Sequence, residues 1–458
     1  MGGFSTYGLL LTEDCNLGCK YCYERLASGH NKNQMSQQVA TRFVEYAFDE
    51  AVRSGQKSVT VSFFGGEPTL MPGIIDLICT QSKNFSVQTG VGFSAGIITN
   101  ATNMNRELYR VLHAHLDIWT STQLSIDGPQ DIQDLSRVTK NGGGSFALIE
   151  RNMPYWRELY GNDRLNIHGV LVPETIGRLF ESFLFFREEW GVEQLWFLPA
   201  KSEWEARHVS EYERELEKIC QYILQKVTAS NSLDEANHYA PLNRAMSSGA
   251  RGKPCGAGET YCTVSANGDI WPCHHFYFID NGGGLRLGNV FEGVDSGRQR
   301  IWLEYDESDM VGCSDCDHAS CYRCIAENYE RHGSPFVQIK DDHCEFMLVD
   351  QKIQKKLKQE LVAMGLINKS DCDVVQSDCL GNVRDCVGKV GDCPKVVSVD
   401  DCKFDRKEDF RQNTDIAPRS YDEVGDVCKK EKCFCGDSIV KELLDDMIKV
   451  LVAHHNRM

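Results

Sequence analysis

Short apolar runs alternate with amphipathic stretches over the first 230 residues of the chain. The runs are rich in β-branched and aromatic residues, as expected for buried strands, and they cover residues 7–11, 59–64, 91–98, 123–126, 167–172 and 194–198. Between them, apolar positions recur at helical spacing, for example over 39–52 and 176–189. Six such units predict an α/β domain with a parallel sheet, because parallel strands need crossover connections.

Polar and glycine motifs follow the predicted strands at their carboxyl ends. Right-handed crossovers would form a partial barrel or an open sheet, and both arrangements bind ligands at this edge. The motifs are a cysteine loop at 15–22, Gly65-Gly66-Glu67-Pro68, Thr99-Asn100, and the pair Ser125 and Asp127. We therefore expect one site that collects them all.

The overall composition excludes some classes of function. With 458 residues and 41% hydrophobic content, the chain can form two or three domains with a sizeable core. A formal net charge of −17 disfavours a general nucleic-acid-binding protein, which needs a basic surface. No apolar run approaches the roughly 18 residues of a membrane span, and the amino terminus does not resemble a signal peptide. We therefore expect a cytoplasmic protein with no nucleic-acid or membrane partner.

The 21 cysteines indicate metal or catalytic chemistry, because thiols in a reducing compartment rarely form disulfides. Cys79 and Cys220 stand alone in helix-like segments and are interpreted as core residues. Cys15, Cys19 and Cys22 offer three thiolates within one short loop. A 4Fe-4S cluster usually takes four thiolates, so three leave one iron open. A zinc site that borrows a histidine is the alternative.

The loop Cys-x3-Cys-x2-Cys, with an aromatic residue before its last cysteine and Gly-Gly-Glu-Pro downstream, resembles the radical S-adenosylmethionine (SAM) superfamily. The resemblance spans the first 230 residues and implies a partial (β/α)6 barrel. It also implies that the open iron binds the amino and carboxylate groups of SAM. Reductive cleavage then gives a 5′-deoxyadenosyl radical, which abstracts hydrogen from a substrate.

The same resemblance assigns residues to the SAM site. Gly65, Gly66 and Glu67 would meet the methionyl ammonium, with Thr99 and Asn100 beside them. Ser125 and Asp127 would lie near the ribose or carboxylate, and Arg137 would pair with the carboxylate. An ordinary turn at Asp127 and a surface ion pair at Arg137 are the structural alternatives.

A second group of eight cysteines lies between residues 255 and 344, enough for two four-cysteine sites. The segment around Gly268 and Cys273 resembles the SPASM extension of peptide- and protein-modifying radical SAM enzymes, which holds two auxiliary 4Fe-4S clusters. By order in the chain, the resemblance assigns Cys255, Cys262, Cys273 and Cys324 to the first cluster and Cys313, Cys316, Cys321 and Cys344 to the second. The spacing of the later cysteines departs from the usual extension, so this partition is open. Taken alone, 313–324 reads as a zinc knuckle.

The position of the cysteine loop near residue 15 most resembles anaerobic sulfatase maturases, which oxidise cysteine or serine to formylglycine. Those enzymes carry an aspartate where this chain has His274, directly after Cys273. Cys-His-x-Phe resembles maturases that form thioether bonds in ribosomal peptides, and a histidine can act as the base. A hydrogen-bonded structural histidine is the alternative. We therefore expect thioether formation ahead of formylglycine formation or carbon–carbon crosslinking, with a non-enzymatic zinc or redox scaffold as the contrasting hypothesis.

The remaining predictions concern partners and the tail. We expect a cysteine-containing peptide or protein substrate and an external electron donor such as flavodoxin or ferredoxin. The predicted domains are 1–235, the barrel; 236–350, a bridging region and SPASM domain; and 351–458, a helix over 351–366 followed by a tail. An Asp-Cys pair recurs every seven residues from 371 to 393 and once more at 401–402. The tail is a substrate-like segment, a further metal site or an extension without chemistry, and 438–454 has the pattern of an amphipathic helix.

Overall fold

One ten-stranded sheet organises the described part of the chain. In this computed structural model the described residues are 3–26, 33–233, 239, 255–280, 283–304, 324–337 and 342–367. Residues Met1–Val375 form one unit, and the second unit, Gln376–Met458, lies outside the described residues. The Asp-Cys repeat and the helix predicted over 438–454 therefore fall outside the part that the structure describes.

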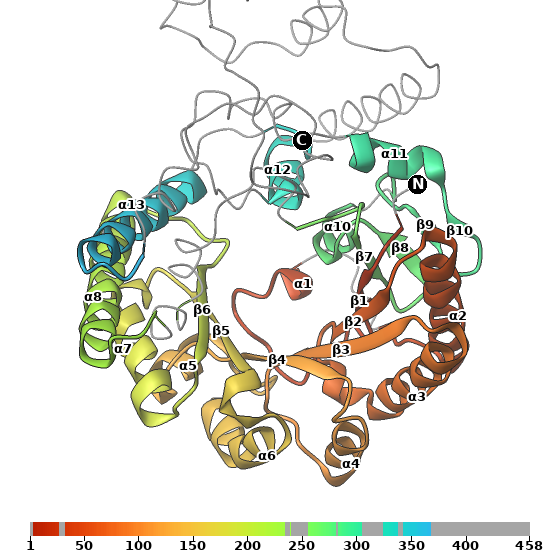
Figure 1. Cartoon of the computed structure of the whole chain (residues 1–458), viewed down its shortest axis with the longest axis horizontal. Helices are drawn as coiled ribbons and strands as arrows, with labels where there is room; N and C mark the ends of the chain where they lie inside the picture. The colour runs from red at the N-terminus through yellow and green to blue at the C-terminus, as the bar shows by residue number, and fades with distance from the viewer. Residues whose placement is uncertain are drawn as a thin grey trace, which may run out of the picture. The chain divides into compact units, whose positions relative to one another are not determined.

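Six parallel strands lie side by side in the order of the sequence. They are β1 (Thr6–Leu10), β2 (Ser58–Phe64), β3 (Gly92–Thr99), β4 (Trp119–Ser125), β5 (Leu165–Leu171) and β6 (Gln194–Pro199). A doubly wound sheet would reverse its strand order at a switch point, whereas here every crossover runs the same way. The sheet curls into a partial barrel with its helices outside, as Figure 1 shows, which confirms the predicted fold class.

The cysteine-rich segment continues the same sheet beyond β1. Strand β7 (Tyr261–Val264) pairs with β1 in parallel, and β8 (Asp269–Trp271), β9 (Gly288–Asn289) and β10 (Gly293–Val294) follow in antiparallel order. Gly268, in the turn between β7 and β8, has a φ of +85°, which glycine adopts without strain. The turn brings Trp271 beside Thr263 and places Cys273 just past the end of β8.

The helices pack their apolar faces on the outside of the barrel. They are α1 (Tyr23–Leu26), α2 (Gln37–Ser54), α3 (Pro72–Thr89), α4 (Arg106–Ala114), α5 (Gln130–Ser136), α6 (Phe146–Arg164), α7 (Leu179–Leu184), α8 (Ala206–Ser230), α10 (His274–Ile279), α11 (Ser296–Glu304), α12 (Ile325–His332) and α13 (Asp342–Ala363). There are exceptions: Figure 1 shows α1 within the ring of strands, and α10, α11 and α12 at the end of the barrel where β7 to β10 continue the sheet. Helix α1 directly follows the cysteine loop, so the chain turns inward at that point.

One strand and one helix begin earlier in the chain than the sequence pattern predicted. Strand β4 begins at Trp119, ahead of the predicted 123–126. The hydrophobic pattern missed its first residues because Thr122 is polar, although it is fully buried. The helix predicted over 351–366 begins at Asp342 and packs along α8. A buried hydrogen bond joins the two helices, in which the Tyr212 hydroxyl donates to Asp350 Oδ1 at 2.8 Å. None of the described helices is long and apolar enough to cross a membrane.

The packing of α13 on α8 predicts unequal effects for two leucines of α13. Leu357 is 0% exposed and Leu348 is 40% exposed. Leu357→Ala should lower the free energy of unfolding by about 2–5 kcal/mol, because it leaves a cavity in the core. Leu348→Ala is the matched control and should change it by less than about 0.5 kcal/mol. Urea titrations followed by circular dichroism would measure both, and equal effects would show that α13 is not docked on the barrel.

Candidate active site at the carboxyl edge of the barrel

The three loop cysteines lie close together just beyond the carboxyl end of β1. Burial raises the pKa of Cys15, with nearby Glu67 and the other two loop thiols adding to the effect. Burial also raises the pKa of Cys19 to about 11, partly offset by Arg137. Such thiols ionise readily only beside a cation, and a bound metal provides one. The donor set therefore fits the 4Fe-4S cluster that the resemblance implies.

The described residues contain no group of three cysteine, histidine or acidic side chains that converges as the ligands of a single metal ion would. A 4Fe-4S cluster makes a different demand, because it binds each thiolate to a separate iron.

Gly65 and Gly66 hold the loop by direct backbone contact. The Gly66 amide donates to the Thr12 carbonyl at 2.8 Å, and the next amide, that of Glu67, donates to the Asp14 carbonyl at 2.9 Å. A Cβ on Gly66 would lie only 2.6 Å from the carbonyl carbon of Asp14, and Gly65 has a φ of +135°. Only glycine at both positions allows this approach without strain. The two glycines thus support the start of the cysteine loop.

Glu67 is a buried carboxylate with most of its hydrogen-bonding capacity in use. Its Oε1 accepts from the hydroxyls of Thr69 and Thr99, both at 2.6 Å, and from the Thr69 amide at 3.1 Å. Within the described residues, its Oε2 accepts from the Asn100 amide alone, at 2.8 Å. Burial raises the pKa of Glu67, and these donors oppose the rise. A carboxylate oxygen has two lone-pair directions, so Oε2 can take one more donor, such as an ammonium.

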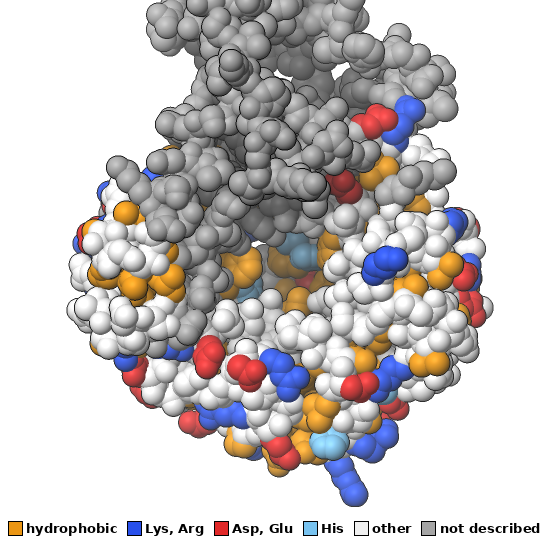
Figure 2. All heavy atoms as spheres, in the orientation of Figure 1, with side chains coloured by type: hydrophobic (Ala, Val, Ile, Leu, Met, Phe, Trp, Pro, Cys, Tyr) orange, Lys and Arg blue, Asp and Glu red, His pale blue; other side chains and the backbone are white. Residues whose placement is uncertain are grey.

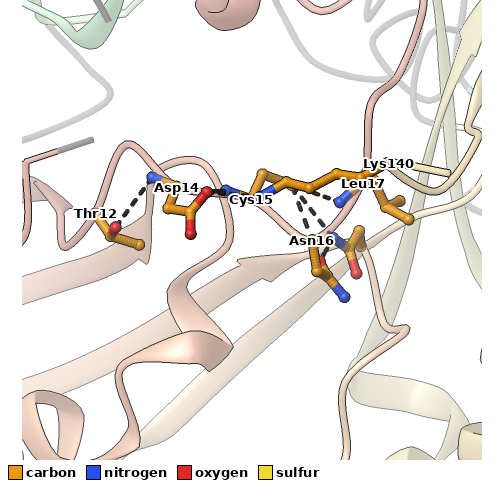
Figure 3. Close-up of polar contacts among 7 residues, drawn as sticks. Thr12, Asp14, Cys15, Asn16, Leu17 and Lys140 are labelled. Carbon is orange, nitrogen blue, oxygen red and sulfur yellow. Dashed lines mark hydrogen bonds and ion pairs between the residues drawn. The ribbon is translucent and has the colours of Figure 1, made fainter. Parts of the chain in front are cut away.

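Asn100 links the end of β3 to the cysteine loop. Its side-chain amide donates to Asn16 Oδ1 at 2.8 Å and contacts Cys15 Sγ at 3.7 Å. The Leu17 amide donates to the same sulfur at 3.4 Å. Figure 3 shows the neighbouring contacts, in which the Cys15 amide donates to Asp14 Oδ1 and the Lys140 ammonium binds that same carboxylate at 2.7 Å. N–H donation to sulfur favours the thiolate form that a cluster requires.

Asp127 clamps the loop rather than facing open space. Its Oδ1 accepts from Arg137 Nε at 2.9 Å and from the Val170 amide at 2.8 Å, and its Oδ2 accepts from the Tyr21 hydroxyl at 2.6 Å. The Arg137 guanidinium also lies over the Tyr21 ring. Both oxygens of Asp127 thus have protein donors, but Oδ2 accepts from Tyr21 alone among the described residues, so the expected contact of Asp127 with a ribose or a carboxylate stays a prediction.

Arg137 and Ser125 remain available to contact a ligand. The ion pair of Arg137 with Asp127 uses only Nε, and its two terminal nitrogens have no partner within the described residues. These nitrogens can bind a carboxylate in the two-pronged manner of arginine. Ser125 ends β4, half-buried, on the sheet face opposite the core residue Leu124.

A second group of thiols lies beside α10 and α12. Cys273 precedes α10, and Cys324 precedes α12. Burial, then the charges of Cys324 and Cys255, raise the pKa of Cys273, while the amides of the first turn of α10 oppose the rise. The structure thus brings Cys255, Cys273 and Cys324 together. It does not bring Cys262 to them, because this residue lies in the core and is influenced by Glu50 of α2 instead.

The remaining cysteines predicted as ligands are placed only in part. Cys344 is half-buried on α13. Cys313, Cys316 and Cys321 lie outside the described residues, so the partition between two auxiliary clusters stays a prediction.

His274 lies between the two groups of thiols, within a set of aromatic rings. Its ring packs against Phe64 at 5.1 Å and Tyr23 at 6.2 Å, measured between centroids, and Tyr23 stacks on His275 at 4.4 Å. Burial and the Lys201 ammonium lower the pKa of His274 to about 4, so its imidazole is neutral at pH 7. Figure 2 shows histidine and hydrophobic side chains inside a hollow on this face of the molecule.

Sequence reasoning missed Tyr21, Tyr23 and Lys201. The charges of Cys22 and of Cys273 both contribute to raising the pKa of Tyr23, after burial and Glu24, so this phenol lies between the two groups of thiols. The Lys201 ammonium lies 5.7 Å from the centroid of the Tyr23 ring and pairs with Glu330 of α12. A signal existed for all three, since two tyrosines flank Cys22 and Lys201 follows the last barrel strand.

The contact of Gly66 with the loop predicts a selective loss on substitution. Gly66→Ala would displace the backbone at Asp14, and a shift of about 1 Å in a reactive site lowers rates roughly 100-fold. Gly73→Ala is the matched control, because its Cβ would meet nothing within 4 Å. We expect Gly66→Ala, but not the control, to abolish the change that added SAM causes in the electron paramagnetic resonance (EPR) spectrum of the reconstituted, reduced protein. Equal SAM responses in both variants would contradict the supporting role of Gly66.

The hydrogen bond from Tyr21 to Asp127 predicts that the Tyr21 hydroxyl helps to hold the cysteine loop in place. Tyr21→Phe removes a hydrogen bond to a buried carboxylate, worth about 1.5–3 kcal/mol. We expect iron to be lost to a chelator at least about tenfold faster than from the unaltered protein. Tyr109→Phe is the matched control, since its hydroxyl donates to Glu158 at 2.8 Å on the surface. If both variants lose iron at the unaltered rate, the clamp does not hold the loop.

Comparison with known proteins agrees with this geometry. Residues 9–185 match the model of the radical SAM superfamily. A cysteine-type anaerobic sulfatase-maturating enzyme of Clostridium perfringens is 24% identical over 328 residues, which cover 68% of this chain and 83% of that protein. A SAM-dependent nucleotide dehydratase of Flammeovirga pacifica is 28% identical over 42% of this chain, and the radical SAM cyclopropyl synthase TigE of Paramaledivibacter caminithermalis is 22% identical. The matches span only 62% and 40% of those two relatives.

Solved structures show the same fold. The protein anSMEcpe with bound AdoMet superposes with a TM-score of 0.62 at 18% identity, covering 80% of this chain and 97% of that one. SuiB of Streptococcus suis, bound to its precursor peptide SuiA, gives a TM-score of 0.50 at 16% identity, covering 75% of this chain and 76% of that one. The domain match and the cysteine loop therefore agree that the chain carries a radical SAM domain at residues 9–185, and the solved structures share its fold.

Proposed function

We propose that this protein is a radical SAM maturase that modifies a cysteine-containing peptide or protein and forms thioether crosslinks. The observation that carries the proposal is the position of the two groups of thiols. They lie on either side of the side chains of Tyr23, His274 and His275. The loop cysteines match the site that cleaves SAM. The second group can bind a substrate or hold a centre that accepts an electron. The relatives named as sulfatase-maturating enzymes, and solved structures that hold peptides, support a peptide or protein substrate.

When bound, a 4Fe-4S cluster and SAM supply the 5′-deoxyadenosyl radical. The residues of this chain position that chemistry. Cys15, Cys19 and Cys22 would hold the cluster, Oε2 of Glu67 would accept a hydrogen bond from the methionyl ammonium, and the terminal nitrogens of Arg137 would bind the carboxylate. These charged groups would fix the amino-acid end of SAM, and proximity of this kind is a large part of catalysis.

His274 is the proposed base that removes a proton from the substrate. Its neutral imidazole can accept a proton, and it lies between the two groups of thiols rather than on the surface. The role matches the aspartate that sulfatase maturases carry after the corresponding cysteine. Two auxiliary clusters, a cytoplasmic location and reduction by flavodoxin or ferredoxin complete the proposal.

Oxidation of cysteine or serine to formylglycine is the second candidate function. The observation that favours it is the extent of the match to the sulfatase-maturating enzyme of Clostridium perfringens, which covers 83% of that protein. Carbon–carbon crosslinking of a peptide is a third outcome of the same radical chemistry. Product analysis by mass spectrometry separates them, since a thioether and a carbon–carbon bond both lose two hydrogens, but only the first removes a free thiol.

The enzyme and the scaffold hypotheses are separated by anaerobic reconstitution. We expect about twelve irons per chain, four for each cluster, and release of 5′-deoxyadenosine from SAM on reduction. Tightly bound zinc without SAM cleavage would contradict the proposal and favour the scaffold.

His274→Ala tests the proposed base. We expect release of 5′-deoxyadenosine to persist while peptide modification falls at least about 100-fold, because general bases contribute 10²–10⁴-fold. Candidate substrates are a synthetic peptide of residues 371–402 and peptides encoded beside the gene. His113→Ala, at an exposed position of α4, is the control. Undiminished modification by His274→Ala would remove His274 from the mechanism.

A further inference from the structure

Lys201 lies at the carboxyl edge of the barrel, just past the end of β6, the last parallel strand. Its ammonium nitrogen lies 5.7 Å from the centroid of the Tyr23 ring and pairs with Oε2 of Glu330, a residue of α12. The side chain of Lys201 is 27% exposed, and that of Glu330 is 42% exposed. The chain thus places a half-buried cation at the edge where parallel barrels bind their ligands.

The side chains behind the Tyr23 ring are apolar. Tyr23 packs against a small cluster formed by Leu10, Phe64 and Phe278. Its ring meets that of Phe278 edge-on, with centroids 5.8 Å apart. Figure 2 shows hydrophobic and histidine side chains inside the hollow on this face. The attraction between two charges is stronger in such a setting than in water, because fewer solvent dipoles screen it. An anion that enters the hollow is therefore stabilised by the Lys201 ammonium.

A buried polar atom beside the same ring makes no hydrogen bond. The His275 imidazole stacks on Tyr23, with ring centroids 4.4 Å apart and an angle of 22° between the planes. Its Nδ1 is buried and has no hydrogen-bond partner within the described residues. Buried polar atoms are nearly always hydrogen-bonded, so an unpartnered one in a functional hollow indicates where a ligand atom binds. An imidazole with its proton on Nδ1 can donate to a carboxylate oxygen, as an ammonium can.

The ion pair with Glu330 leaves Lys201 able to bind a second carboxylate. An ammonium has three N–H donors, and within the described residues Glu330 accepts from one of them. Ion pairs between side chains that are exposed to this degree are weak, because solvent screens them. Glu330 therefore holds the ammonium near Tyr23 without using its full binding capacity.

The sequence of the tail indicates which anion accompanies a cysteine. All five cysteines between residues 371 and 402 directly follow an aspartate. Consecutive Cα atoms lie about 3.8 Å apart, so a carboxylate bound at Lys201 keeps the next residue of its peptide close by. The ring of His274, the proposed base, lies 6.2 Å from the Tyr23 ring that Lys201 also contacts, measured between centroids. A cysteine that follows the bound aspartate is thus within reach of His274.

We propose that Lys201 determines substrate specificity: it binds the carboxylate of an aspartate that directly precedes the cysteine to be modified, and His275 Nδ1 is the second donor. The inference rests on the proposed function, because it requires a cysteine-containing peptide substrate. No covalent bond forms or breaks at this site, since the carboxylate binds in its ionised form and orients the peptide. A lysine that only joined β6 to α12 through Glu330 would give no preference among peptides.

Peptide binding to the full reconstituted chain tests this preference. The probe is the synthetic, fluorescently labelled peptide of residues 383–389, which contains Asp385 and Cys386, and its matched control carries asparagine in place of Asp385. We expect fluorescence anisotropy to give a Kd at least about tenfold lower for the aspartate peptide, the effect of one charge-assisted hydrogen bond. Equal Kd values, or no binding of either peptide, would overturn the proposal. Binding needs no turnover, and release of 5′-deoxyadenosine is measured separately, so failure of the proposed function remains distinguishable.

Variants of Lys201 test whether its charge causes the preference. Lys201→Met should abolish the preference for the aspartate peptide, Lys201→Arg should retain it, and Lys201→Glu should reverse it toward a peptide with lysine in place of Asp385. Lys226→Met is the matched control, because Lys226 also pairs with a glutamate, Glu188 at 3.1 Å, and its ammonium lies 5.1 Å from the centroid of the Tyr222 ring. A preference that survives Lys201→Met would overturn the proposal.

Two further variants separate substrate binding from support of the fold. Glu330→Gln should keep the preference for the aspartate peptide, whereas a loss equal to that of Lys201→Met would assign Lys201 to the contact with α12 instead. His275→Phe keeps a ring stacked on Tyr23 but removes Nδ1, so it should weaken the preference. An unchanged preference in His275→Phe would remove His275 from the site.

Discussion

The backbone of the loop after β1 rests on the backbone of the loop after β2, and the rest of the site depends on that contact. Two amide-to-carbonyl hydrogen bonds join Thr12 and Asp14 to Gly66 and Glu67. The glycines permit the approach, and the carboxylate of Glu67 ties the same loop to the end of β3 through Thr99 and Asn100. Three consecutive strands thus converge on one short segment, which positions Cys15.

The second constraint is the position of Tyr23. Helix α1 follows the cysteine loop into the interior of the barrel, where the Tyr23 ring meets His275 and Lys201. These contacts connect the radical SAM domain to the segment that carries Cys273. The chemistry proposed for the protein follows from this proximity, because a radical formed at one group of thiols can act on a side chain held at the other. Burial lowers the pKa of both histidines, and the charge of Lys201 adds to this effect.

The sequence predicted the barrel and the edge that carries the site, because apolar alternation and strand order are local properties of the chain. It could not predict which partner each polar group would find. Tyr21 and Arg137 both bind Asp127, for example, and the contact with Tyr21 joins segments more than 100 residues apart, which no local pattern reveals. Cys262 shows the same limit, since counting cysteines does not reveal which face of β7 each side chain occupies.

The central claim, that a radical formed in the barrel abstracts hydrogen from a peptide, is tested most directly by isotope transfer. The full-length reconstituted protein is reduced with SAM and a peptide substrate deuterated at its carbon-bound positions, and the 5′-deoxyadenosine is analysed by mass spectrometry. The account predicts deuterium in the 5′-deoxyadenosine and, for thioether formation, no transfer when only the cysteine β-carbon is labelled. Modified peptide accompanied by 5′-deoxyadenosine without deuterium would contradict it.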